Sequence, residues 1–111
     1  LFNLSNTDKN DAITEVFKSK AVLLGSPTVN NGILVAVAAI LEEIKGLKFK
    51  NKKAGAFGSY GWSGEAVKLL SDRLSDSGFD LINDGLRLTW APDEESMQSC
   101  RDYGVSFAKS V

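Results

Sequence analysis

Residues 58–64 read Gly-Ser-Tyr-Gly-Trp-Ser-Gly and constrain the fold more than any other stretch. A short apolar run, residues 54–57, precedes them, and a helical pattern begins near Glu65. Glycine at three of seven positions lets the backbone turn sharply and approach a ligand closely. Tyr60 and Trp62 are costly to leave exposed unless something flat lies against them. The stretch therefore predicts a strand, a tight loop that binds a flat group, and a helix.

The composition places the chain among ordinary globular domains. It has 111 residues, 43% hydrophobic and 24% charged, with a formal net charge of −1. These values suit one domain and argue against disorder and against a nucleic-acid binder driven by net charge. The absence of histidine excludes histidine-ligated metals and histidine acid–base catalysis, and one cysteine excludes an internal disulfide. The longest apolar run, residues 33–41, is too short for a membrane span of about 20 residues. We therefore expect a cytoplasmic protein that binds neither nucleic acid nor membrane.

Apolar runs and helical patterns alternate along the chain. The apolar run at 21–24 suits a strand that is covered on both faces. The helix expected at 33–44 is apolar almost all round, which indicates either deep burial or a face covered by a partner. Strict alternation predicts an α/β fold, a three-layer α/β/α sandwich with a parallel sheet. The expected strands are 1–4, 21–24, 54–57, 79–82 and 86–90, and the expected helices are 8–18, 33–44, 65–77 and 92–111.

The sequence also predicts which parts of two further segments are exposed or buried. The segment 45–53 holds five lysines and is expected to be a solvated loop. The last helix is expected to bury a stripe, in which the cysteine is a core residue rather than a reactive thiol. The members of this stripe are Met97, Cys100, Gly104, Phe107, Ala108 and Val111.

Two unusual loops follow two successive strands of the predicted sheet. Residues 25–32 contain Pro27, Thr28 and Asn30, and residues 58–64 contain the two aromatic side chains. Successive strands usually lie side by side, and ligands of open α/β sheets bind beyond their carboxyl ends. We therefore expect the two loops to form the walls of one cleft. A phosphate-binding Gly-x-x-x-x-Gly-Lys motif and the serine-hydrolase nucleophile elbow are both missing.

Four stretches carry a resemblance to a known family. They are residues 22–31, Val-Leu-Leu-Gly-Ser-Pro-Thr-Val-Asn-Asn, the lysine-rich 46–53, residues 56–66 around the aromatic loop, and 90–94, Trp-Ala-Pro-Asp-Glu. The chain resembles, over essentially its whole length, the flavodoxin-like domain of flavodiiron proteins, which are oxygen and nitric oxide reductases. The resemblance implies a flavodoxin-like fold that binds FMN. The residues it assigns to FMN are Ser26, Pro27, Thr28, Asn30, Ser59, Tyr60, Gly61, Trp62, Ser63 and Gly64.

The same resemblance implies a role in electron transfer. FMN would accept electrons from a rubredoxin or a flavin/nicotinamide reductase and pass them to a diiron centre on another domain of the same protein. A homo-oligomer is expected. Neither a catalytic residue nor a metal ligand is assigned within this chain, and the fragment alone is not expected to turn over substrate.

One departure from the family pattern changes the expectation for FMN affinity. The domain, residues 1–111, is expected to be incomplete at its N-terminal side, because the first strand and its Ser/Thr-rich phosphate loop do not precede Leu1. The ligands of the diiron site are not found in the chain either. The chain alone is therefore expected to bind FMN weakly. Two alternatives stay open: a flavin-dependent quinone reductase of the flavodoxin-like group, and a flavin-free interaction domain whose apolar helix 33–44 binds a partner.

Overall fold

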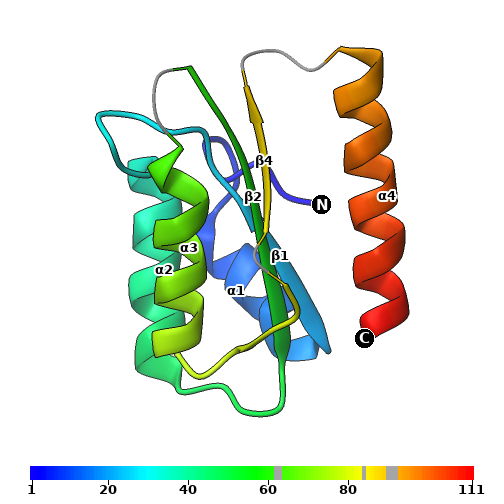
Figure 1. Cartoon of the computed structure of the whole chain (residues 1–111). Coiled ribbons are helices and arrows are strands. Elements are labelled where there is room, and N and C mark those ends of the chain that lie inside the picture. The colour runs from blue at the N-terminus through cyan, green and yellow to red at the C-terminus, as the bar shows by residue number, and fades with distance from the viewer. Residues whose placement is uncertain (62–63, 84, 90–92) are drawn as a thin grey trace.

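Figure 1 shows the computed structural model of the chain, in which helices and strands alternate as predicted. The structure describes residues 1–61, 64–83, 85–89 and 93–111. The helices are α1 (Lys9–Lys18), α2 (Val35–Leu47), α3 (Glu65–Asp76) and α4 (Glu94–Ser110). The strands are β1 (Ala21–Gly25), β2 (Lys53–Tyr60), β3 (Asp80–Leu81) and β4 (Leu86–Thr89).

The sheet is parallel, and β2 is its central strand. β1 pairs with β2 from Ala21 opposite Lys53 to Gly25 opposite Phe57. β3 and β4 both pair with the other edge of β2, one after the other along its length. The predicted interruption between these two strands is confirmed, and the Oδ1 atom of Asn83 accepts a hydrogen bond from the Gly85 N–H group across it.

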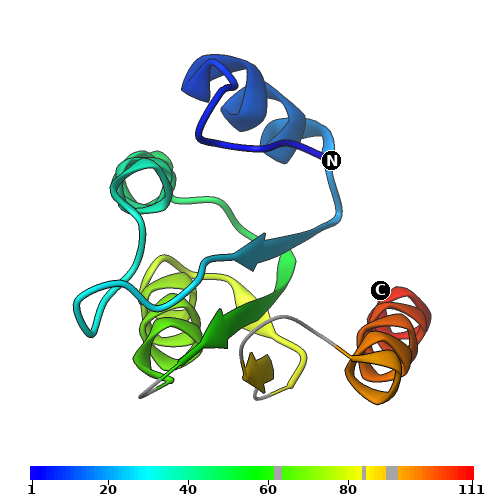
Figure 2. The same ribbon diagram turned by 90° about the horizontal axis from the view of Figure 1, so that it is seen from above.

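The helices divide unequally between the two faces of the sheet. Figure 2 shows α2 and α3 on one side and α4 alone on the other, with α1 beyond the β1 edge. Helix α2 buries Val37, Ile40, Leu41 and Ile44 in the core. Burial within this chain therefore accounts for one face of α2, whereas Val35 at its start is 85% exposed. The whole cluster is Ala12, Ile13, Leu24, Val37, Ile40, Leu41, Ile44, Phe49, Ala54, Ala56, Val67, Leu70, Leu74 and Phe79.

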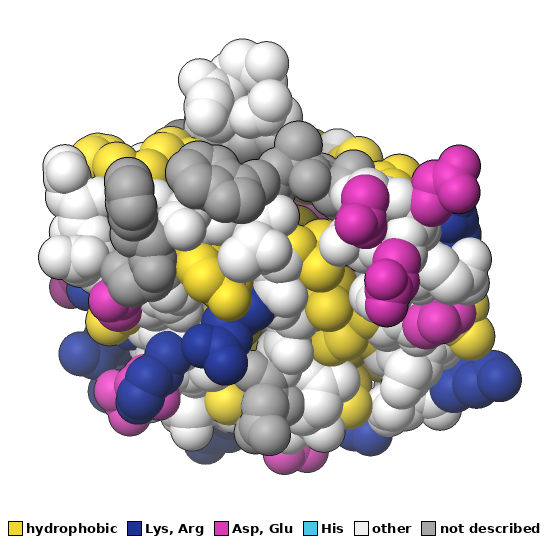
Figure 3. Space-filling view, turned by 45° about the horizontal axis from the view of Figure 1, so that its top comes forward, with side chains coloured by type: hydrophobic (Ala, Val, Ile, Leu, Met, Phe, Trp, Pro, Cys, Tyr) yellow, Lys and Arg dark blue, Asp and Glu magenta, His cyan; other side chains and the backbone are white. Residues whose placement is uncertain are grey.

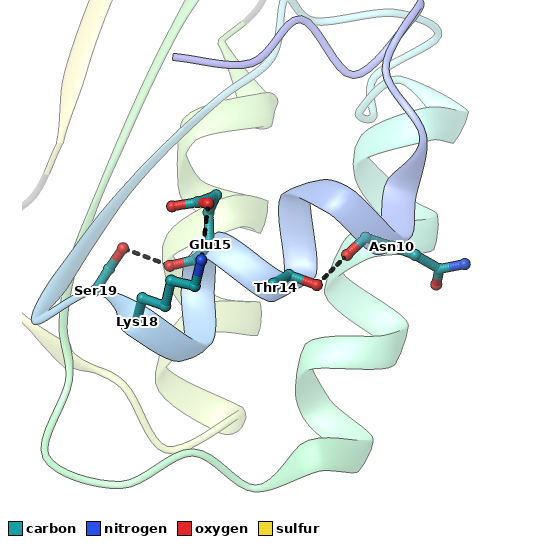
Figure 4. Close-up of polar contacts among 5 residues, drawn as sticks. All are labelled: Asn10, Thr14, Glu15, Lys18 and Ser19. Atoms are coloured by element: carbon teal, nitrogen blue, oxygen red, sulfur yellow. Dashed lines mark hydrogen bonds and ion pairs between the residues drawn. The ribbon is translucent and has the colours of Figure 1, made fainter.

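Helix α1 matches the range expected from the sequence. Asp8 is its N-cap residue and accepts a hydrogen bond from the Asn10 N–H group at 2.8 Å. Figure 4 shows the other polar contacts along this helix, including the bond from Thr14 Oγ1 to the Asn10 carbonyl and the Lys18–Glu15 ion pair. These contacts are local. The rest of the domain holds α1 through its buried Ala12 and Ile13, through the Lys9–Glu43 ion pair with α2, and through bonds from Lys52 Nζ to the carbonyl groups at its end.

The strand predicted at residues 1–4 is wrong. These residues pair with no strand in the described part of the chain; instead the Asn6 N–H group donates to the Asn3 carbonyl in a turn. The predicted cover on both faces of β1 is also wrong, since the Leu23 side chain is 39% exposed. Both errors have one cause: an apolar run forms a covered strand only where neighbouring elements supply hydrogen bonds and packing, and helix α4 covers Leu23 of β1 only in part.

The stripe predicted for α4 is correct only in part. Phe107 is buried, but Met97 and Val111 are 45% and 49% exposed. The orientation of α4 is set by Gly55 of β2, where an added Cβ would lie 2.6 Å from Tyr103 Oη and 3.0 Å from Phe107 Cε2. Cys100 and Gly104 lie near this face and are half-buried, whereas Ala108 is exposed.

The lysine-rich segment is more structured than predicted. Helix α2 continues into it as far as Leu47. Lys52 Nζ donates to the carbonyl groups of Phe17 and Ser19 at the end of α1, and Lys53 Nζ donates to the Ser110 carbonyl at the end of α4. Cations at helix C-termini are favourable because the carbonyl groups there lack partners and the helix dipole is negative. Two of the lysines therefore stabilise helix ends instead of facing solvent freely.

Candidate functional site

The two loops singled out in the sequence lie next to each other at the carboxyl ends of β1 and β2. The pairing of these strands continues beyond β1, because the Ser26 N–H group donates to the Phe57 carbonyl at 3.1 Å. The Thr28 N–H group donates to the Ser59 carbonyl at 2.9 Å. The expectation that the two loops lie side by side is therefore confirmed, and a cleft between them stays a prediction.

Gly58 allows this close approach. An added Cβ at Gly58 would lie 2.2 Å from the Ser26 carbonyl oxygen, which is backbone and cannot move aside as a side chain could. It would also lie 3.3 Å from a methyl group of Val67 in α3. The distance between the two loops thus depends on glycine at position 58.

Ser26 holds the first loop in place. Its side chain is buried, at 3% exposure, and its hydroxyl group donates to the Pro27 carbonyl at 2.8 Å. The same hydroxyl oxygen accepts from the Leu34 N–H group, at the start of α2, at 3.0 Å. Ser26 was predicted as a ligand contact; the structure gives its hydroxyl group two partners inside the protein, a role that the sequence did not reveal.

The tip of the first loop is a tight hairpin turn. The N–H and carbonyl groups of Val29 and Gly32 pair with each other, at 3.1 and 2.8 Å. Asn30 and Asn31 between them have φ angles of 50° and 60°. Two central residues with positive φ are typical of a type I′ turn, for which asparagine is well suited. The Asn-Asn-Gly sequence could have predicted this turn. Asn30 and Pro27 both lie exposed on this loop.

Thr28 joins the first loop to helix α3. Its Oγ1 atom accepts a hydrogen bond from the Ala66 N–H group, in the first turn of α3, at 3.3 Å. The N-cap residue of this helix, Gly64, supplies no side-chain cap of its own. Thr28 therefore serves as the cap, and it fixes the start of α3 relative to the first loop.

The second loop is described on both sides of its centre. Ser59, Tyr60 and Gly61 are partly buried, and Trp62 and Ser63 lie outside the described residues. The Tyr60 ring folds back toward the start of α3, since its edge comes within 3.2 Å of the point where a Cβ on Gly64 would lie.

Two further residues, Arg87 and Glu65, lie close to this loop and were not among the site residues predicted from the sequence. Arg87 of β4 brings its Cδ atom within 3.3 Å of the same point beside Gly64. The Oε2 atom of Glu65, in the first turn of α3, is buried and has no hydrogen-bond partner. Arg87 could be found only from the pairing of β4 with β2, which the sequence did not specify. Within the described residues, histidine, cysteine and carboxylate side chains form no group of three that could hold a metal ion.

Comparison with known proteins places the chain in a family. The family model for flavodoxin matches residues 1–104. The chain belongs to the flavodoxin family. The predicted flavodoxin-like fold is thereby confirmed, and the sheet, helices and loop positions agree with it. Among the described residues, no helix has the length and hydropathy needed to cross a membrane.

Relatives of this flavodoxin-family chain include the proteins that its sequence resembles. An anaerobic nitric oxide reductase flavorubredoxin of Aliivibrio salmonicida is 52% identical over 98% of the chain. The solved rubredoxin oxygen:oxidoreductase of Desulfovibrio gigas is 36% identical, with a TM-score of 0.91 over 96% of the chain. A flavodoxin from the domain Archaea has a TM-score of 0.84 at 26% identity over the same share of this chain. The resemblance to flavodiiron proteins is confirmed by these matches.

The relatives are longer than this chain. It spans 22% of the Aliivibrio protein, 27% of the Desulfovibrio protein and 73% of the archaeal flavodoxin. The chain therefore matches one flavodoxin-like part of the first two proteins.

Proposed function

We propose that this chain is the FMN-binding electron-transfer domain of an oxygen or nitric oxide reductase. It receives electrons from a rubredoxin or from a flavin/nicotinamide reductase and passes them to a diiron centre on another domain of the same protein. The similarity to a nitric oxide reductase flavorubredoxin and to a rubredoxin oxygen:oxidoreductase supports this proposal. A cytoplasmic location and a homo-oligomeric state are parts of the same proposal, and a single cysteine is consistent with a reducing compartment.

The observation that carries the proposal is the junction at Thr28. This residue bonds to Ser59 through its backbone and to Ala66 through its hydroxyl group. It thereby ties together two loops at the carboxyl ends of neighbouring parallel strands, where α/β proteins of this type bind ligands. The residues that we propose to hold FMN are those predicted from the sequence: Ser26, Pro27, Thr28, Asn30, Ser59, Tyr60, Gly61, Trp62, Ser63 and Gly64.

The side chains around the junction fit a flat heterocycle. Tyr60 offers an aromatic surface, and Asn30 offers an exposed amide group that can both donate and accept. The buried Oε2 atom of Glu65 is an acceptor without a donor, and a flavin ring carries an N–H group. The flavin supplies the redox chemistry, while the protein binds the ring, orients it and sets the charge around it.

We propose further that the phosphate of FMN is bound by residues outside 1–111, and that another strand covers β1. The edge of β1 that faces away from β2 has no partner strand in the described chain. A groove of about 520 Å³ runs along this edge, lined mostly by apolar side chains from residues 1–5, α1, α2 and β1. An open strand edge beside an apolar groove suits an extended apolar segment, which would supply both hydrogen bonds and packing.

The test uses the full-length protein that contains this domain, with the substitution Thr28→Val. Valine keeps the shape of threonine but cannot accept from the Ala66 N–H group. The loss of one hydrogen bond, about 0.5–1.5 kcal/mol, should weaken FMN binding by roughly three- to tenfold. Thr14→Val is the matched control, because Thr14 is exposed on α1 and bonds only within that helix. Affinity is measured from the quenching of FMN fluorescence.

Equal FMN affinities of the two variants would contradict the site. A full-length protein that binds no FMN would contradict the proposed function as a whole. Turnover of quinones with a nicotinamide donor, without reduction of oxygen or nitric oxide, would instead support the quinone-reductase alternative.

A further inference from the structure

Arg87 lies beside the aromatic wall of the proposed flavin site. It belongs to β4 and is paired in register with Gly58 of β2. Strand β2 thus lies between β4 and β1, the strand that the first loop follows. Its Cδ atom and the edge of the Tyr60 ring come within 3.3 and 3.2 Å of one point, the position of a Cβ on Gly64. The Arg87 Cδ atom and the Tyr60 ring therefore both lie beside Gly64, and Arg87 as a whole is exposed.

The charge of Arg87 has no partner among the described residues. The ion pairs in the described part of the chain are Lys9–Glu43, Lys18–Glu15 and Lys68–Asp72. The Oε2 atom of Glu65, in the first turn of α3, is buried and has no hydrogen-bond partner. Acidic side chains gather instead on the side of the molecule where α4 begins, with Glu94 and Glu95 in its first turn (Figure 3).

This position is unfavourable for a cation in the absence of an anion. The start of a helix carries a partial positive charge, and a positive side chain there is repelled. Arg87 lies close to the start of α3 and forms no ion pair with a described residue, so its charge raises the electrostatic potential there, against the opposing charge of Glu65 in the first turn. A negative charge that arrives next to Tyr60 would be stabilised by this arrangement.

We propose that Arg87 is a positioning residue that stabilises the negative charge of the reduced flavin. This inference rests on the proposed function. Oxidised FMN takes up two electrons and one proton from its donor, and the ring gains one negative charge. The positive charge of Arg87, whose Cδ atom lies beside Gly64, favours that charged form over the oxidised form by a Coulomb interaction.

The test compares midpoint potentials of FMN bound to full-length protein. In Arg87→Gln, the equilibrium between reduced and oxidised flavin should shift toward the oxidised form by roughly three- to tenfold. A tenfold shift lowers the potential by about 30 mV for two electrons. Arg87→Lys keeps the charge and should retain most of the potential. Arg73→Gln, at the opposite end of α3, is the control and should leave the potential unchanged. Dithionite titration with reference dyes measures each value.

Three results would overturn the proposal. Equal potentials in Arg87→Gln and Arg73→Gln would exclude an effect of the Arg87 charge, while FMN binding by both would leave the proposed function intact. A weaker affinity of Arg87→Gln for oxidised FMN but not for riboflavin would place the phosphate, not the ring, beside Arg87. Absence of FMN from the unmodified protein would contradict the proposed function, and this inference with it.

Discussion

The site depends at the residue scale on contacts between backbone groups. At Gly58 the chain passes within van der Waals contact of the Ser26 carbonyl, and at Thr28 it bonds to Ser59. Such contacts set the spacing of the two loops more tightly than side-chain packing would, because backbone atoms cannot rotate away. The spacing then decides whether a flat ring can enter between the loops.

Gly58→Ala should therefore open the site and weaken the sheet around it. The added Cβ would meet a carbonyl oxygen at 2.2 Å, so the backbone must shift. Overpacking of this kind destabilises by about 1–3 kcal/mol. Hydrogen exchange of the β1 and β2 amides in the full-length protein measures the local stability. Gly46→Ala is the control: nothing lies within 4 Å of its Cβ, and an alanine inside α2 should stabilise by about 0.5–1 kcal/mol. Equal protection in both variants would contradict the role of Gly58.

The positions of some site residues could be predicted from the sequence, whereas the contacts of others could not. The density of glycine and aromatic residues at 58–64 predicted a loop after a strand, and the pairing of this strand with β1 confirms its position beside the first loop. Ligand binding by this loop stays a prediction. The roles of Ser26 and Thr28 could not be predicted, because their partners, Leu34 and Ala66, become neighbours only when the loops fold against α2 and α3. Asn30 lies in a tight turn that the Asn-Asn-Gly sequence at residues 30–32 could have predicted.

At the scale of the elements, helix α4 begins at a side-chain cap. Asp93 accepts a hydrogen bond from the Ser96 N–H group at 2.8 Å. This backbone hydrogen bond to the charged carboxylate holds the pKa of Asp93 below its usual value. A lowered pKa in the folded state means that the cap contributes stability above the unfolded pKa, about 3.9, and loses it as the pH falls through the folded pKa.

Asp93→Ala should thus increase hydrogen exchange at the start of α4 at neutral pH. The expected increase concerns the Ser96 and Met97 amides, which bond to the side chain and the carbonyl group of Asp93. Asp93→Asn is the control, because asparagine caps a helix about as well but does not titrate. The difference between the alanine and wild-type proteins should shrink below pH 4 and the asparagine protein should not show this change. A difference that stays constant with pH would contradict a cap by the ionised carboxylate.

Secondary structure was predictable wherever local signals were sufficient. The predicted end of the helix at residue 77 lies within one residue of the end of α3 at Asp76, and Gly78, with a positive φ of 95°, follows it. The break between the two strands around Asn83 also follows from local residue chemistry. The strand at residues 1–4 and the stripe of α4 were mispredicted because they depend on partners. A strand requires a neighbour to bond with, and the face of α4 is chosen by the space at Gly55.

The whole molecule has a sheet with unequal cover. One face is covered by α2 and α3, while on the face of α4 the side chains of Leu23 and Phe57 stay 39% and 40% exposed. The groove along β1 is lined by these two side chains as well. This distribution supports the proposal that further chain packs here in the longer protein, where it would also complete the FMN site.

The proposed stacking of the loop at residues 58–64 on a flavin is tested most directly by the FMN affinities of two variants of the full-length protein. Trp62→Ala should weaken binding by about ten- to a hundredfold, since stacking of a flat ring on an aromatic side chain contributes about 1–3 kcal/mol. Cys100→Ser, a change to a half-buried residue on α4, should leave affinity unchanged. Fluorescence quenching of FMN gives both constants. A clear loss in the first variant alone is the predicted result, and equal affinities in the two variants would contradict the account.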